Sequence, residues 1–349
     1  MTNLKNSLVN YSIQAKPWAE QNILRKILAI RLQALGDLVI TLPYLQYLKR
    51  NLPEVTKLDL LTRKEVDEIP KNIILFDKVY SIGGGRNYKK QIFLSSFLLP
   101  ELFLNKYDAI IDLQNNTVSR FITKSLFPKS CTRFDRFSTI AAGDRTKSTI
   151  EALGIGNCYA DTNFKLKNES DGFEILKNNG WNIENNLVIL NPAGAFKTRN
   201  WPVENYIGFA NLWLHKFPKT QFAILGVENI LGKANYLKEK LGEKLINLVN
   251  RTTIAQAFSV VQQSKFVLSE DSGLMHMAWV SGIPTLTLFG STRSDWARPL
   301  GNHTFFHDSS DLECGNCMKE ICKHGDNRCM TRYKPQEIFE NAMDLFLNK

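Results

Sequence analysis

Residues 26–37, KILAIRLQALGD, decide the fold of this chain. The short apolar run at residues 26–32 is typical of a buried strand, and the amphipathic run at residues 38–50 is typical of a helix. A strand that leads directly into a helix is the repeating unit of a mostly parallel sheet covered on both faces. The rest of the first half continues this alternation, with further strands expected at residues 57–62, 78–82 and 107–113.

The second half starts the same alternation again after a polar segment at residues 167–186. Strands are expected there at residues 187–190, 221–225, 265–268 and 285–289. Since 349 residues exceed what one core usually holds, we expect two doubly wound, Rossmann-like α/β domains, at residues 1–165 and 166–349. Ligands of such sheets bind outside the carboxyl ends of the strands, so facing domains would form an interdomain cleft. The last helix, at about residues 335–347, could pack back on the first domain.

The composition is that of a folded globular protein, with 44% apolar and 22% charged residues. The net charge of +10 favours polyanionic partners, but nucleic acid is disfavoured because the chain carries no recognised binding motif. No segment reaches the roughly 18 apolar residues of a membrane-spanning helix. The first 24 residues lack the apolar core of a secretory signal, so we expect a cytoplasmic protein.

The turn after the first strand carries Asp37 beside a helix N-terminus. Such an aspartate can cap the free amides of the first helical turn, or its carboxylate can face the cleft and act on a ligand. A dinucleotide-binding turn needs the pattern G-x-G-x-x-G, of which only Gly36 is present. The turn therefore disfavours a nicotinamide-dependent enzyme.

The second domain opens with a strand that ends at Asn191, followed by a loop of small residues that includes Ala193 and Gly194. Small residues let a ligand approach the backbone. Lys197 and Arg199 come next, and a lysine charge and an arginine fork just beyond a strand end suit phosphate oxygens. A solvated basic loop is the alternative.

The strongest local feature is the strand, tight turn and helix around Asp271. The amides of Ser272, Gly273 and Leu274 would point out of the helix N-terminus, where the helix dipole also favours anions. The turn therefore predicts a diphosphate site, with an unoccupied capped helix as the alternative. His276 could contact the same ligand or bond a neighbouring loop.

A further carboxylate, Glu228, follows the strand expected at residues 221–225. A carboxylate in this position is suited to the hydroxyls of a nucleotide ribose. An exposed glutamate at the start of a helix would give the same pattern.

Four of the six cysteines cluster late in the chain, in the pattern C-x2-C-x4-C-x6-C: Cys314, Cys317, Cys322 and Cys329. In a cytosolic protein such a cluster suggests metal before disulfide. Structural zinc is one prediction. Reduced thiols and disulfide pairing are the alternatives, because the spacing matches no standard zinc finger closely.

Taken together, five motifs resemble the ADP-heptose:lipopolysaccharide heptosyltransferase family, glycosyltransferase family 9, in order and spacing over about residues 26–300. They are LGD at 35–37 with LP at 42–43, NPAG at 191–194, the segment 197–202, GVE at 226–228 and DSGLMH at 271–276. The resemblance implies a GT-B fold, with two Rossmann-like domains facing a cleft. It also implies an inverting transferase that moves a sugar from a nucleotide diphosphate, with ADP-heptose as the expected donor, to a lipid-linked saccharide.

The resemblance assigns roles to the motifs. Asp37 is the family's catalytic base, the Lys197 region and the Ser272 turn hold the donor phosphates, and Glu228 binds the ribose. Asp37 would take the proton of the acceptor hydroxyl, while Lys197 and Arg199 stabilise charge on the leaving diphosphate. The family uses no bound divalent metal, which fits the absence of an Asp-x-Asp pair here, so no cofactor is expected for catalysis.

The segment at residues 112–119 departs from the family pattern. Asn115 and Val118 stand where the family usually has glycine and lysine. Because that region faces the acceptor, the acceptor could differ from inner-core lipopolysaccharide, and no quoted motif recognises heptose itself. A nucleotide-sugar epimerase and a non-catalytic nucleotide-sugar-binding protein of the same fold are the competing functions.

An acceptor anchored in lipid must be met at a membrane surface, so we expect peripheral attachment to anionic membranes. The candidate contact is the stretch at residues 86–104, where Arg86, Lys89 and Lys90 precede a run of apolar residues. Cations would meet headgroups while apolar side chains enter the interface. The alternative is that these apolar residues pack in the core of the first domain.

Overall fold

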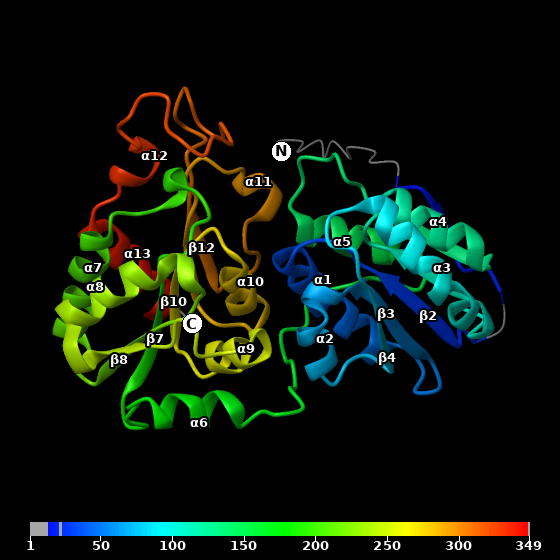
Figure 1. Cartoon of the computed structure of the whole chain (residues 1–349), viewed down its shortest axis with the longest axis horizontal. Helices are drawn as coiled ribbons and strands as arrows, with labels where there is room; N and C mark the ends of the chain where they lie inside the picture. Colours follow the sequence, from blue (N-terminus) through cyan, green and yellow to red (C-terminus); the bar gives the residue numbers. More distant parts are fainter. Residues whose placement is uncertain (1–12, 21–22, 348–349) are drawn as a thin grey trace, which may run out of the picture.

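A computed structural model describes residues 13–20 and 23–347 of the chain. Figure 1 shows two α/β domains side by side, and each contains one six-stranded sheet. The strands of the two sheets lie at residues 15–133 and 186–307, on either side of the expected boundary. The structure agrees with the predicted GT-B architecture of two Rossmann-like sheets.

The first sheet has the order β1-β6-β5-β2-β3-β4, and every pairing is parallel except that of β1 with β6. Its strands are β1 (Ala15–Lys16), β2 (Lys26–Ile30), β3 (Lys57–Arg63), β4 (Lys78–Ile82), β5 (Ala109–Asp112) and β6 (Ser130–Arg133). Its helices are α1 (Leu35–Asn51), α2 (Glu68–Asn72), α3 (Tyr88–Leu104), α4 (Thr117–Leu126) and α5 (Ala142–Glu151), with a 3-10 turn η1 (Lys64–Val66).

The second sheet is parallel throughout, in the order β12-β11-β10-β7-β8-β9. Its strands are β7 (Asn186–Asn191), β8 (Thr220–Ile224), β9 (Leu245–Asn247), β10 (Phe266–Glu270), β11 (Thr285–Leu288) and β12 (Thr304–His307). Helix α6 (Asp171–Asn178) leads into this domain, which holds α7 (Val203–Lys216), α8 (Leu231–Leu241), α9 (Ile254–Gln262), α10 (Gly273–Val280), α11 (Ser294–Ala297), α12 (Arg328–Thr331) and α13 (Pro335–Leu347). Three 3-10 turns complete it: η2 (Lys197–Arg199), η3 (Glu228–Ile230) and η4 (Gly242–Lys244).

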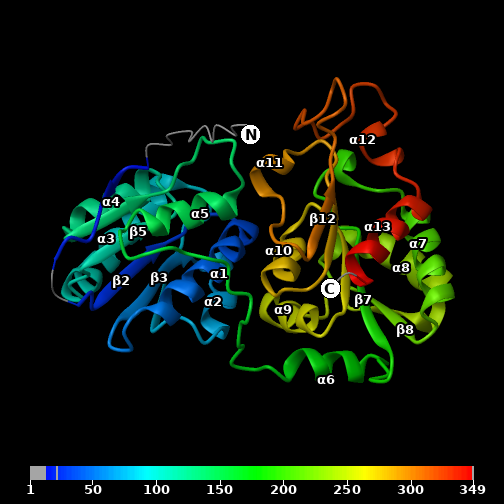
Figure 2. The ribbon, with the colours of Figure 1, turned by 180° about the vertical axis from the view of Figure 1, so that it is seen from behind.

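Helix α13 packs within the second domain, against α7, β11 and β12, and not on the first domain as the sequence allowed. Its buried residues Ile338, Ala342 and Met343 belong to the apolar cluster that contains Trp213 and Phe209 of α7. The aromatic stack of α7 therefore supplies the apolar surface that the amphipathic last helix covers. Figure 2 shows α13 beside α7, away from the first domain.

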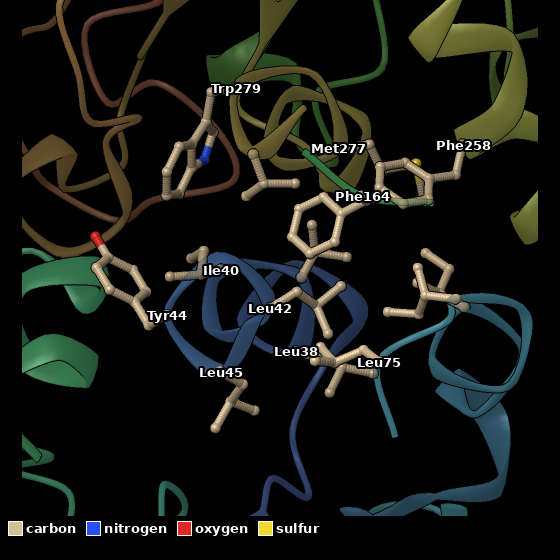
Figure 3. Packing of buried hydrophobic residues seen from close by; sticks show 14 of the residues in the cluster. Leu38, Ile40, Leu42, Tyr44, Leu45, Leu75, Phe164, Phe258, Met277 and Trp279 are labelled. Carbon is tan, nitrogen blue, oxygen red and sulfur yellow. The ribbon is translucent and has the colours of Figure 1, made fainter. Parts of the chain in front are cut away.

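The two domains share one apolar core around α1 and α10. Figure 3 shows Leu38 and Leu42 of α1 together with Phe164, Phe258 and Met277. A hydrogen bond also crosses between the domains, from the Ala255 amide to the Glu68 carboxylate (2.9 Å). Apolar burial of this kind is the main favourable term in packing, so it fixes how the carboxyl ends of the two sheets face each other.

Within the described residues, no helix is long and apolar enough to cross a membrane.

Candidate functional site

A cleft between the domains collects the ends of both sheets. The first domain lines it with Arg31, Gln33, Ala34, Gly36, Asp37, Ile40, Arg86, Gln114, Phe134, Arg136, Ala142 and Arg145. The second domain lines it with Ala195, Phe196, Arg199, Asp271, Ser272, Gly273, His276, Trp296, Ala297 and Glu320. Sequence motifs that are more than 200 residues apart thus meet in one cavity.

Asp37 lies inside the first turn of α1, whose N-cap position is occupied by Ala34. The helix begins earlier than residue 38, so the capping explanation for Asp37 does not hold. Its carboxylate instead forms an ion pair with Arg31 (Nη2 to Oδ1, 3.0 Å). Arg31 is only 2% exposed and also donates to the Leu113 carbonyl, whereas the Asp37 side chain is 35% exposed. A buried arginine therefore orients a carboxylate that is open to the cleft.

The first-domain side of the cleft is strongly basic. Arg136 and Arg145 lie beside Arg31, and the guanidinium groups of Arg31 and Arg145 lie 4.7 and 4.9 Å from the centre of the Phe134 ring. Burial lowers the pKa of Arg145, and the positive charge of Arg31 lowers it further. An anionic group that entered here would relieve the repulsion between these cations.

The two cations of the η2 turn have different positions. Arg199 lines the cleft, forms an ion pair with Asp271 (3.3 Å) and lies 4.3 Å from the Phe196 ring centre. Lys197 is exposed and is not among the residues that line the cleft. Its carbonyl accepts a hydrogen bond from Asn327 (3.1 Å). Arg199 is therefore the better placed of the two for a ligand in the cleft.

The N-terminus of α10 lies between two cavities. Ser272 and Gly273 line both the charged cleft and a second, mostly apolar pocket. The Ser272 hydroxyl accepts from the Asn191 amide (2.6 Å) rather than capping the helix. The first amides of a helix have no intrahelical acceptor, and the helix dipole favours an anion there. The predicted diphosphate turn is thus located where a ligand could extend from one cavity into the other.

The apolar pocket is lined by Leu35, Asn191, Ala193, Leu225, Gly226, Val227, Asn229, Thr252, Thr253, Ile254, Ala257, Ser272, Gly273, Leu274 and Met277. Ala193 and Leu274, expected at the donor, are among them. Glu228 is not, although both of its neighbours are. The Glu228 carboxylate is exposed and accepts from the Asn250 side chain (2.5 Å). It lies beside this pocket with its carboxylate engaged by Asn250.

His276 lies in the cleft opposite Asp37. Its Nδ1 is 3.1 Å from the indole nitrogen of Trp279. An indole N–H can only donate, so Nδ1 accepts and the proton of the neutral ring is on Nε2. Burial lowers the pKa of His276, although Asp271 and Asp37 act against this shift. The ring therefore stays neutral and can donate from Nε2.

The segment with the unusual residues Asn115 and Val118 has a structural explanation. Val118 is fully buried in the first domain, and the Asn115 side chain donates to the Phe134 carbonyl (2.8 Å). Both residues stabilise the β5–α4 loop, while Gln114 of the same loop lines the cleft. The departure at Val118 thus places an apolar side chain in the core and not in the cleft.

The four late cysteines line one pocket, together with His324. All six cysteines of the chain are described, and all are free thiols. The Cys329 thiol donates to the Thr198 carbonyl (3.5 Å), and the Cys322 thiol donates to Asp326 (3.6 Å). In residues 13–20 and 23–347, no three His, Cys, Asp or Glu side chains are arranged to hold a metal ion. The predicted zinc at Cys314, Cys317, Cys322 and Cys329 is therefore not supported by the arrangement of these side chains.

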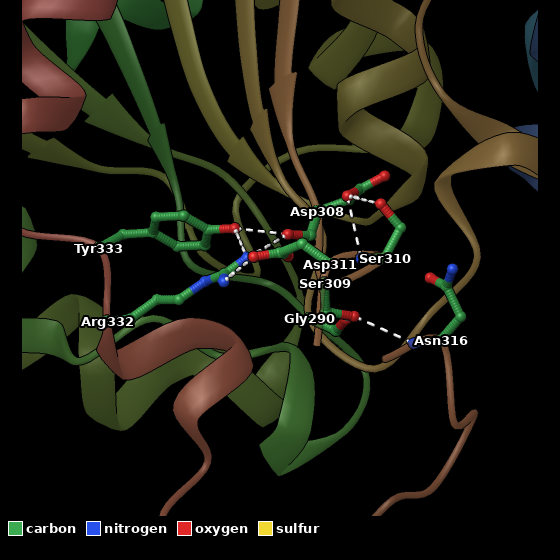
Figure 4. A network of polar contacts seen from close by, with 8 residues as sticks. All are labelled: Gly290, Asp308, Ser309, Ser310, Asp311, Asn316, Arg332 and Tyr333. Carbon is green, nitrogen blue, oxygen red and sulfur yellow. Dashed lines mark hydrogen bonds and ion pairs between the residues drawn. The ribbon is translucent and has the colours of Figure 1, made fainter. Parts of the chain in front are cut away.

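The loop that carries these cysteines is held by the polar network in Figure 4. Arg332 forms an ion pair with Asp311 (2.5 Å) and donates to the Asp308 carbonyl (2.6 Å), which also accepts from the Tyr333 hydroxyl (2.6 Å). The Asn316 amide donates to the Ser309 hydroxyl (3.1 Å). These contacts anchor the loop to the second domain.

Sequence reasoning missed several residues of the site. Arg31 lies within the strand expected at residues 26–32 but was given no role, and Arg136 and Arg145 lie after β6 and on α5, which no motif marked. Glu270 follows the strand expected at residues 265–268 and was given no role, yet its carboxylate binds the loop that carries Arg199. The position of Arg31 at the end of β2 was the one available signal, since strand ends were expected to meet at the cleft.

The sequence model of glycosyltransferase family 9 (heptosyltransferase) matches residues 149–327, just over half of the chain. Lipooligosaccharide heptosyltransferase 2 of Campylobacter jejuni is 26% identical over 190 residues, which cover 53% of this chain and 56% of that protein. The chain thus spans little more than half the length of that curated relative.

Solved structures of this family share the fold, as two of them illustrate. The glycosyl transferase family 9 from Veillonella parvula superposes with a TM-score of 0.79 at 18% identity, covering 95% of this chain and 100% of that chain. The E. coli heptosyltransferase WaaC with ADP gives a TM-score of 0.65 at 18% identity, covering 93% of this chain and 99% of that chain.

Proposed function

Because the chain belongs to glycosyltransferase family 9 (heptosyltransferase), we propose that it transfers a heptose from ADP-heptose to a lipid-linked saccharide such as lipopolysaccharide core. The transfer inverts the anomeric centre and uses no divalent metal. One observation supports this most: the α10 N-terminus separates an apolar pocket from a charged cleft that contains Asp37. This arrangement fits the three parts of a nucleotide sugar, which are the base, the diphosphate and the sugar.

The donor would place its nucleoside in the apolar pocket beside Leu35, Ile254 and Met277. Its diphosphate would lie at Ser272 and Gly273, where free amides and Arg199 can neutralise charge on the leaving group. The WaaC structure with ADP supports an adenosine diphosphate ligand for this fold. Lys197 is exposed on the η2 turn that also carries Arg199, and it would contribute less than Arg199 to binding the diphosphate.

Asp37 would act as the general base. Its carboxylate is held by Arg31 at 3.0 Å and is open to the cleft, so it can take the proton of an acceptor hydroxyl as that oxygen attacks the anomeric carbon. The bond from the anomeric carbon to the donor phosphate breaks on the opposite face, and the electron pair leaves with the diphosphate. His276, neutral and able to donate from Nε2, could bind an oxygen of either substrate.

Incubation of the purified protein with ADP-heptose and a lipopolysaccharide-core acceptor tests this proposal. Mass spectrometry should show an acceptor heavier by one heptose, together with stoichiometric ADP. Conversion of the nucleotide sugar without acceptor would instead indicate an epimerase. Binding of ADP-heptose without any product in the presence of acceptor would indicate a non-catalytic binding protein.

We propose further that the protein works on the cytoplasmic side of an anionic membrane and contacts it through α3 and α4. Leu102 of α3 is buried, and Ile92, Leu98 and Leu99 pack against the core, but Phe93, Phe97 and Leu104 are 62%, 69% and 77% exposed. They recur at helical spacing on one face, and Phe127 after α4 adds a fourth exposed apolar side chain. We call these four residues the α3–α4 surface; the helices carrying it lie at the outer end of the first domain (Figure 1).

The charge around the α3–α4 surface suits anionic lipid. The segment that carries it has these exposed cations: Arg86, Lys89, Lys90, Lys106, Arg120, Lys124 and Lys129, the last of which pairs with Glu20. Over residues 86–129 the only exposed acidic side chain is Glu101, which pairs with Lys78. Lys89 and Lys90 precede Phe93 by about one helical turn, so cations and apolar rings are on the same face. Because Arg86 lines the cleft, this surface leads to the acceptor side of the site.

Co-sedimentation with phosphatidylglycerol vesicles at low salt tests the contact. The double variant Lys89→Glu/Lys90→Glu should bind more weakly than the parent, and Phe93→Ser/Phe97→Ser should lose binding that remains at higher salt. Lys216→Glu/Lys219→Glu is the matched control, because it reverses two exposed lysines of the second domain. Equal binding by both charge-reversed variants would show that the α3–α4 surface is not the contact.

A further inference from the structure

The loop between β7 and α7 brings Arg199 to the cleft, although it has little regular structure of its own. Apart from the η2 turn, residues 192–202 belong to no helix or strand. A loop of this kind needs contacts from elsewhere to keep one conformation. The position of the loop therefore depends on the side chains that bind its two ends.

A single carboxylate, that of Glu270 at the end of β10, holds both ends. Oε2 accepts from the Gly194 amide and Oε1 accepts from the Trp201 amide, each at 2.7 Å. Oε2 also accepts from the Asn200 side chain at 3.3 Å. Glu270 is 0% exposed, so these hydrogen bonds are shielded from water. The eight residues from Gly194 to Trp201 thus form a loop that is closed by the two oxygens of one side chain.

Lys233 of α8 completes this clamp. Its ammonium donates to the Pro192 carbonyl and to the Asn200 side chain, each at 2.8 Å. The Asn200 side chain in turn donates to the Gly194 carbonyl at 2.8 Å. Burial raises the pKa of Glu270 to about 7, while Lys233 and the two backbone amides act against this shift. The Glu270 carboxylate and the Lys233 ammonium thus provide hydrogen-bond partners for backbone groups of this loop.

The packing leaves the loop little freedom to move toward its neighbours. A Cβ atom at Gly194 would lie 2.7 Å from the Arg199 carbonyl oxygen, and one at Gly290 would lie 1.9 Å from the Thr198 carbonyl oxygen. The backbone of η2 is therefore in close contact with glycines on two sides. A change in the clamp would shift the segment that carries Arg199.

We infer that Glu270 is a positioning residue, which acts through the Gly194–Trp201 loop to hold Arg199 at the diphosphate site. Its own carboxylate is fully enclosed by the loop and by β10, and it does not line the cleft. Arg199 instead reaches the cleft and Asp271. The role of the loop as a diphosphate site rests on the proposed function, but the clamp itself does not.

The experiment compares the parent with Glu270→Gln, which keeps the size of the side chain but presents an amide N–H to one of the two backbone donors. Hydrogen–deuterium exchange of peptides covering residues 192–202 should become about tenfold faster, since a buried amide loses its acceptor. The Kd for ADP, measured by calorimetry, should rise about tenfold for the same reason. Glu270→Asp, which is one methylene too short to span both amides, provides a second variant if the first folds poorly.

Asp59→Asn is the matched control, because Asp59 is a buried carboxylate of the other domain that accepts from the Tyr107 hydroxyl (2.6 Å) and lines neither the cleft nor the apolar pocket. It should lower the melting temperature without changing the Kd for ADP. Arg199→Ala should have a much smaller effect in the Glu270→Gln background than in the parent, because the two residues act in series.

Three results would overturn the inference: unchanged exchange of the loop, unchanged affinity for ADP, or fully additive effects of the two substitutions. If the parent bound no ADP, the proposed donor would be wrong, and inorganic pyrophosphate would replace ADP as the probe. Faster loop exchange with weaker pyrophosphate binding in Glu270→Gln would then still support the positioning role, and equal binding would refute it.

Discussion

Replacing Asp37 by asparagine should abolish most of the transfer activity while leaving the fold and donor binding nearly intact. The asparagine oxygen can still accept the hydrogen bond that Arg31 donates at 3.0 Å, so the side chain keeps its orientation. What the variant loses is the ability to take a proton from the acceptor hydroxyl. The substitution therefore separates the chemical role of Asp37 from its structural one.

The two effects differ in size. Positioned general bases typically contribute about 10²- to 10⁴-fold in rate, which is about 3–5 kcal/mol of barrier, so kcat should fall by that factor. Breaking a fully buried ion pair costs about 3–5 kcal/mol of stability, but the Asp37 side chain is 35% exposed and the hydrogen bond is kept. We therefore expect a loss of about 1–2 kcal/mol in the free energy of unfolding.

The assay measures kcat by ADP release, the Kd for ADP by calorimetry and the melting temperature. Asp161→Asn is the matched control, because Asp161 also pairs with an arginine, Arg50 of α1, but lies outside the cleft. It should leave kcat unchanged. If Asp37→Asn kept more than a tenth of the parental kcat with an unchanged fold, Asp37 would not be the base.

Three more predictions follow from the site. Arg199→Ala should raise the Kd for ADP at least tenfold through loss of a charge-assisted hydrogen bond, whereas Lys197→Ala should change the Kd much less. If calorimetry gave the reverse order, Lys197 and not Arg199 would be the main phosphate ligand. Activity should survive EDTA, and its loss with the fold intact, reversed by magnesium, would contradict a metal-free mechanism. Because burial raises the pKa of Glu270 to about 7, the folded state holds a proton between pH 4.5 and 7 that the unfolded state has lost, so the free energy of unfolding falls as the pH rises through this range. Urea unfolding should therefore show the parent losing about 3 kcal/mol relative to Glu270→Gln between pH 4.5 and 8, and a pH-independent difference would contradict the buried carboxylate.

The sequence predicted the strands whose apolar runs are long enough to be buried on both faces. The runs that became β2, β3, β4, β5, β7, β8, β10 and β11 agree with the structure to within two residues at each end. The strands that it missed carry weaker patterns. β6 reads SCTR, and β1, β9 and β12 are edge strands of two to four residues. Such strands are defined by hydrogen bonding to a neighbour that is distant in sequence, which a local pattern does not encode.

The sequence predicted which loops form the candidate site, but it did not predict which side chains of those loops face the cleft. Lys197 and Arg199 are two positions apart, and only the conformation of η2 decides that Arg199 faces the cleft while Lys197 is exposed. In the same way, Glu270 and Asp271 are adjacent in sequence, but the first is buried under the loop and the second lines the cleft. Tertiary contacts make these choices, so residue type and spacing alone could not.

The glycine of the LGD motif illustrates how structure changes the meaning of a motif. From the sequence, Gly36 was the single remaining glycine of a dinucleotide-binding pattern. In the structure, a Cβ atom at this position would lie 2.7 Å from the imidazole Cδ2 of His276, so the glycine permits α1 and α10 to meet across the domains. This contact places Leu35 at the apolar pocket and Asp37 in the charged cleft, on either side of Gly36. The distance between the proposed base and the donor site therefore depends on the contact between α1 and α10. A larger residue at position 36 would push these helices apart, and so separate the base from the donor, without changing any residue of the base or donor site.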